Sequence, residues 1–84
     1  MLVTIGSITT ATRLARLIER NTGSAASVVN TPMSIKTGGC SYSVRFGDRI
    51  KDDVLRIMRQ YNIPIRKIYR ESYNGKKRVY YDIS

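Results

Sequence analysis

The chain has 84 residues, enough for one domain with a single core, and its 42% hydrophobic and 25% charged residues are typical of a globular protein. With no His and only one Cys, it excludes His-based acid–base catalysis, a Ser-His-Asp triad, a zinc finger and an internal disulfide. Fifteen Lys and Arg against six Asp and Glu leave a net charge of +9, which indicates an anionic partner such as nucleic acid or an acidic protein surface.

No apolar run approaches the roughly 18 residues that a transmembrane helix needs. The Met1–Ile5 segment lacks the basic start and the length of a signal peptide. A single unpaired thiol also fits a reducing compartment better than an oxidising one. We therefore expect a cytoplasmic protein that does not enter a membrane.

The first elements are a strand and a helix. Leu2–Ile5 is rich in strand-forming residues and stops at Gly6-Ser7. Thr9 or Thr10 is the predicted cap of the following helix, because a hydroxyl can accept a free backbone N–H. The helix ends near Gly23, a residue that readily adopts the left-handed conformation. Its apolar residues have helical spacing: Ala11, Leu14, Ala15 and Ile18.

Two strands and a loop come next. Ala25–Asn30 is the second predicted strand, and Thr31-Pro32 ends it because proline has no N–H for a sheet. Met33–Gly39 is a predicted loop. The third strand begins at Cys40, since polar and apolar residues then alternate. Its predicted buried face consists of Cys40, Tyr42, Val44 and Phe46, and the other face of Ser41, Ser43 and Arg45.

The residues after Phe46 are predicted to form a helix and a hairpin. Asp48 is the predicted cap of the second helix, and Pro64 is its predicted stop. Ile65–Tyr69 is the fourth strand. Asn74-Gly75 favours a type I′ turn, and Arg78–Ile83 is the returning strand. The apolar stripe of the helix consists of Ile50, Val54, Ile57, Met58 and Tyr61.

This order of elements, βαββαβ with a further strand, predicts an α+β protein of ferredoxin-like fold. Two helices would cover one face of an antiparallel sheet, with a C-terminal β-hairpin as an extension. We expect one domain over residues 1–84, with a core of residues 1–70 and a hairpin extension of residues 71–84. The fold alone does not indicate a function.

Cys40 is the residue with intrinsic chemical reactivity. It follows Gly38-Gly39, which leave a thiol sterically open and allow backbone N–H groups to face an anion. Lys36 lies four residues earlier and could favour the thiolate electrostatically. The alternative is a structural Cys, because its parity with Val44 and Phe46 would direct it into the core. Both interpretations stay open on the residues alone.

The second candidate is a basic surface rich in tyrosine. Its cations could hold phosphates while the tyrosines stack on bases, or the segment could simply be a solvated hairpin. In an RNA-recognition module the third strand carries stacking aromatics, but those positions fall on Ser41 and Ser43. We therefore expect weak, sequence-independent nucleic-acid binding at most. The surface consists of Arg66, Lys67, Arg70, Lys76, Lys77 and Arg78, interleaved with Tyr69, Tyr73, Tyr80 and Tyr81.

Several short motifs together resemble the Putative Se/S carrier protein-like family of small bacterial proteins. They are Leu2–Ser7, Thr31-Pro32, Gly39-Cys40-Ser41 and Val44-Arg45-Phe46, and the resemblance covers roughly residues 2–70. Ser41 stands where members often have Gly, and Met33 where a charged residue is common. Residues 71–84 extend beyond the family pattern.

The resemblance implies a role for each matched residue. Cys40 would accept sulfur or selenium, Thr31 and Pro32 would form the loop before it, and Arg45 would be the Arg of the following strand. The supporting residues would also include Lys36, Gly38, Gly39 and Ser41. Such a protein is a relay with a transfer partner rather than a self-sufficient enzyme, and we expect no cofactor and no metal. The alternative is a small basic binding module in which Cys40 is structural.

Overall fold

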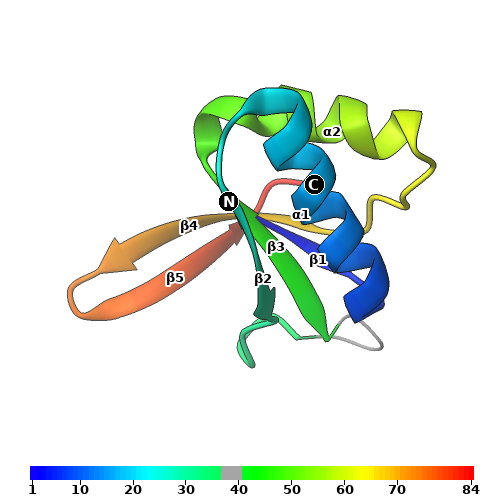
Figure 1. Ribbon diagram of the computed structural model, residues 1–84. Coiled ribbons are helices and arrows are strands. Elements are labelled where there is room, and N and C mark those ends of the chain that lie inside the picture. Colours follow the sequence, from blue (N-terminus) through cyan, green and yellow to red (C-terminus); the bar gives the residue numbers. More distant parts are fainter. Residues whose placement is uncertain (37–40) are drawn as a thin grey trace.

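The computed structural model describes residues 1–36 and 41–84 (Figure 1). It has an α+β architecture, with two helices and a sheet of five strands, as the sequence predicts. Among the described residues, no helix is long and apolar enough to cross a membrane. The elements are β1 (Leu2–Ile5), α1 (Ile8–Thr22), β2 (Ala26–Asn30), β3 (Tyr42–Phe46), the 3₁₀ turn η1 (Asp48–Ile50), α2 (Lys51–Gln60), β4 (Ile68–Asn74) and β5 (Lys77–Asp82).

The strands are all antiparallel to their neighbours and follow the order β2-β3-β1-β4-β5. β1 lies in the middle and pairs with β3 along its whole length, from Leu2 opposite Arg45 to Ile5 opposite Tyr42. Both helices lie on the same face of this sheet (Figure 1). Among residues 1–36 and 41–84, no helix lies on the other face.

The core lies between the helices and the sheet. The predicted stripe of α1 is buried, and it packs against apolar residues of β1 and β3. The apolar stripe of α2 packs into the same core beside α1, while Ile50 and Tyr61 pack at its margin. The periodicity of the sequence thus places the two buried helix faces correctly. Fully buried side chains include Val3, Leu14, Ile18, Val44, Val54 and Met58.

The helix ends differ from the predictions. Ser7, not Thr9 or Thr10, caps α1, and its Oγ accepts a hydrogen bond from the Thr10 N–H at 3.2 Å. The Asp48 side chain makes no capping hydrogen bond; its carboxylate accepts from the Met1 amino group at 3.2 Å. α2 ends before Pro64, because Asn62 already adopts a left-handed conformation with φ 55°.

The strand ends differ as well. β3 begins at Tyr42, with Ser41 just before it, whereas the predicted start at Cys40 lies outside the described residues. β4 begins at Ile68, where it meets Val3 of β1, not at Ile65. The hairpin loop is Gly75-Lys76, one residue later than predicted, because Asn74 still pairs with Lys77. Gly75 has φ 66° whereas Lys76 has no positive φ, so the turn is not type I′.

The β4–β5 hairpin projects from the body of the molecule as a two-stranded ribbon (Figure 1). Only Ile68 and Tyr69 of β4 pair with β1, whereas β4 and β5 pair with each other from Tyr69–Asp82 to Asn74–Lys77. At its base, the Ile83 N–H donates to the Ile68 carbonyl at 2.9 Å. The ribbon is therefore anchored at its base.

Candidate functional site

The loop between β2 and β3 is closed at its base by backbone hydrogen bonds. Asn30 pairs with Tyr42 in the sheet, and the Thr31 N–H then donates to the Ser41 carbonyl at 2.9 Å. Next to it, the Ile35 N–H donates to the Pro32 carbonyl at 3.1 Å and forms a turn. Thr31, Pro32 and Ser41 thus lie at the base of this loop. Gly38, Gly39 and Cys40 lie outside the described residues.

Buried hydroxyl groups support the base of this loop. Thr31 Oγ1 and Ser43 Oγ lie 2.8 Å apart, and their residues are 5% and 0% exposed. Ser43 sits opposite Thr4 of β1, whose Oγ1 accepts a hydrogen bond from the Lys67 N–H at 3.2 Å. Each hydroxyl has a partner, as buried polar groups require. Thr31 therefore has a structural role in holding the loop to the sheet.

The burial of Ser43 corrects one prediction. The alternation of β3 predicted a single buried face, with Ser43 on the other side. In the structure both Ser43 and Val44 are fully buried. Ser43 is therefore unavailable for stacking or for contact with solvent. The sequence offers only a weak signal for this, namely hydroxyl residues within or next to three strands: Thr4, Thr31 and Ser43.

Arg45 does not lie at the corner around Thr31, and of Lys36 the structure shows only that it is exposed. Lys36 is exposed on the loop, and the thiol with which it was predicted to interact lies outside the described residues. Arg45 lies near the opposite end of β3, about 13 Å along the strand from Ser41 at roughly 3.3 Å per residue. Its guanidinium binds the carboxylate of Glu71 through two hydrogen bonds of 3.0 Å. Arg45 thus ties the sheet to the ribbon, a role that sequence reasoning missed.

A pocket of about 300 Å³ opens at the end of the sheet where β1 leads into α1. Gly6, Ser7 and Arg66 line it. Nη2 of Arg66 lies 3.8 Å from the position that a Cβ on Gly6 would occupy, so the guanidinium is next to the Gly6 backbone. Ile5, which also lines the pocket, pairs with Tyr42, two residues after Cys40 in the sequence. The first turn of α1 and Arg66 both favour negative charge there.

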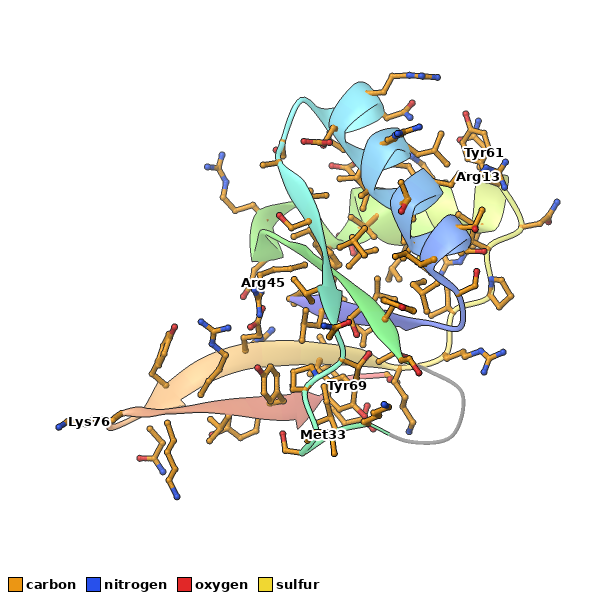
Figure 2. All side chains as sticks on the ribbon, turned by 60° about the horizontal axis from the view of Figure 1, so that its bottom comes forward. Arg13, Met33, Arg45, Tyr61, Tyr69 and Lys76 are labelled. Carbon is orange, nitrogen blue, oxygen red and sulfur yellow. The ribbon has the colours of Figure 1, made fainter. Side chains whose placement is uncertain are left out.

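The predicted basic residues of the ribbon lie on both of its faces, and some of them bind partners within the protein. Lys67 binds Asp82 at 3.0 Å, and Arg78 donates to the Tyr73 hydroxyl at 2.6 Å and covers its ring. The Asp82 hydrogen bond raises the pKa of Lys67. The Ser84 N–H and Lys67 lower the pKa of Asp82 to about 2. Arg70, Lys76 and Lys77 lie elsewhere on the ribbon, with Lys76 at its tip (Figure 2).

Comparison with known families agrees with the short motifs identified in the sequence. The family model described as "Putative Se/S carrier protein-like" matches residues 1–70. The chain belongs to this family. No curated protein and no solved structure matches it significantly. The Se/S carrier match spans the loop that contains Cys40 and ends within β4, so it leaves the outer part of the ribbon uncovered.

Proposed function

We propose that this protein carries sulfur or selenium on Cys40 and passes it to a protein partner. The observation that carries the proposal is membership of the Se/S carrier family together with the presence of a single Cys. A carrier that uses a cysteine thiol must therefore use Cys40. We also propose that the protein acts in the reducing cytoplasm, which keeps an unpaired thiol free.

The transfer is a thiol exchange without net oxidation. The Cys40 thiolate attacks the terminal sulfur of a donor persulfide, R–S–SH, and forms a new S–S bond. The donor's S–S bond breaks, and R–S⁻ leaves with the electron pair, so that Cys40–S–SH remains. A partner thiolate then attacks the same terminal sulfur and releases the Cys40 thiolate. Selenium follows the same path through Cys40–S–SeH.

The surroundings of the loop support this role. The Thr31 N–H···Ser41 bond and the Thr31–Ser43 hydroxyl pair hold the loop ends, while Gly38-Gly39 precede the thiol in sequence. The pocket lined by Arg66 lies at the same end of the sheet as the base of this loop, and its positive charge would favour a thiolate or persulfide brought next to it. We further propose that β1 to β4 and the two helices form a ferredoxin-like unit, because β1 lies between β3 and β4 in the sheet.

The test is persulfide trapping on the native protein. Incubation with a sulfane donor should add one sulfur atom to the intact mass, and a dithiol should remove it. Cys40→Ser should abolish the addition without changing the circular dichroism. Lys36→Gln should slow alkylation of Cys40 if the ammonium favours the thiolate, whereas Lys76→Gln at the ribbon tip should not. A thiol that reacts only after denaturant is added would contradict the carrier role and make Cys40 a packing residue.

A further inference from the structure

The outer part of the β4–β5 ribbon has two chemically different faces. Ile68 at its base lies in the core, so the residues that follow it at every second position continue the helix-covered face of the sheet. No helix covers them there (Figure 1). With their partners on β5, this outer face consists of Arg70, Ser72, Asn74, Lys77, Val79 and Tyr81.

The charges of the ribbon separate between these faces. Both acidic residues of β4 and β5, Glu71 and Asp82, lie on the opposite face, where each binds a cation. The outer face carries Arg70 and Lys77 without an acid of its own, and Lys76 extends it at the tip (Figure 2). Arg70 Nε forms a long ion pair of 4.0 Å with Asp48, which lies in η1 and not on the ribbon. The outer face is therefore basic.

An exposed aromatic ring lies among these cations. Tyr81 is 56% exposed and sits directly opposite Arg70. Tyr73, on the other face, is also exposed, but the Arg78 guanidinium lies over its ring at 5.3 Å. A ring beside cations is the combination that binds unpaired bases, since the base stacks on the ring while its phosphates meet the charges.

We propose that this outer face binds single-stranded nucleic acid, with Tyr81 stacking on a base and Arg70, Lys76 and Lys77 holding the backbone. Charge complementarity favours this ligand, because a second copy of a chain with net charge +9 would be repelled. A base in a duplex is already stacked and paired, so the ring selects unpaired strands. The site is distinct from Cys40 and does not depend on the carrier role.

The experiment measures fluorescence anisotropy of labelled oligo(U) and oligo(dT) 12-mers at several salt concentrations. Arg70→Gln with Lys77→Gln should weaken binding and reduce the slope of log affinity against log salt by about 1.4, because two phosphate contacts are lost. Tyr81→Ala should weaken binding about tenfold at every salt concentration.

Matched variants separate a site from general charge attraction. Arg16→Gln with Arg20→Gln on α1 removes the same charge from another surface, and Tyr73→Ala removes a ring from the opposite ribbon face. Both control variants should retain most of the affinity of the unaltered protein for the single-stranded oligomers. Equal losses in test and control variants would overturn the proposal. So would equally tight binding of a duplex or of poly-glutamate, or no binding at low salt.

Discussion

Individual charges in this basic chain are positioned by short-range partners. Asp82 accepts a hydrogen bond from the Ser84 N–H at 2.9 Å and from Lys67 Nζ at 3.0 Å. These contacts favour the carboxylate over the carboxylic acid, which lowers the pKa of Asp82 to about 2. The same pair raises the pKa of Lys67, with Asp82 as the main cause.

The pH dependence of the stability follows from the directions of these two pKa shifts. Asp82 binds its proton more weakly in the folded state, so its contribution to stability is complete above about pH 4 and is lost as the pH falls towards 2. The contribution of Lys67 is complete below its unfolded pKa and is lost at higher pH, above its raised folded value. An NMR titration of Asp82 should give a midpoint of about 2. Lys67→Gln should raise this midpoint but leave it below the ordinary value, because the Ser84 N–H remains; Lys76→Gln should not move it.

At the scale of the structural elements, the base of the loop between β2 and β3 is held by a contact with β3 that the loop sequence does not indicate. The Thr31 hydroxyl is buried, and Ser43 is its hydroxyl partner at 2.8 Å. Removal of one partner leaves the other buried without this hydrogen bond. The stability of the sheet and the placement of the loop are therefore linked.

Ser43→Ala should lower the free energy of unfolding by about 1–3 kcal/mol, the cost of a buried unsatisfied polar group. Urea unfolding measures this loss. Ser27→Ala, at an exposed position of the neighbouring strand β2, should change the free energy by less than about 0.5 kcal/mol. Thr31→Val combined with Ser43→Ala should cost less than the sum of the single variants. Equal effects of the Ser43 and Ser27 variants would argue against the hydroxyl pair.

Across the whole molecule, the family match and the folded unit have different boundaries. The match ends at residue 70, yet residues beyond it contact the core. Ile83 packs against the core, and its N–H donates to Ile68. Glu71 binds Arg45 of β3. The division into a core of residues 1–70 and an extension stays a prediction, and these contacts indicate that the two parts stabilise each other.

A chain that ends after Arg70 should therefore be less stable than the full chain by at least about 2 kcal/mol, the lower range for the loss of a packed Ile. Thermal and urea unfolding of both chains measure the difference. Lys76→Ala, which changes only the exposed ribbon tip, should leave the stability within about 0.5 kcal/mol. An unchanged unfolding midpoint in the shortened chain would show that the ribbon adds nothing to the core.

Local patterns in the chain were enough to predict the α+β class, both helices, the buried stripes and the family. Helix and strand periodicities depend on neighbouring residues, so Leu14 with Ile18, or Val44 with Phe46, identify a buried face before any partner is known. The identity of the thiol is equally local, because Cys40 is the only Cys and follows two glycines. Its surroundings stay a prediction.

Contacts between segments far apart in the sequence decided the side-chain partners, the burial of polar residues and the ends of the strands. Arg45 and Glu71 are 26 residues apart, so no short pattern connects them. Ser43 is fully buried, and its hydroxyl partner Thr31 lies 12 residues earlier, across the loop. β4 starts at Ile68 because that is where it meets Val3 of β1. A side chain's partner depends on which segments the fold brings together, and sequence spacing does not contain that information.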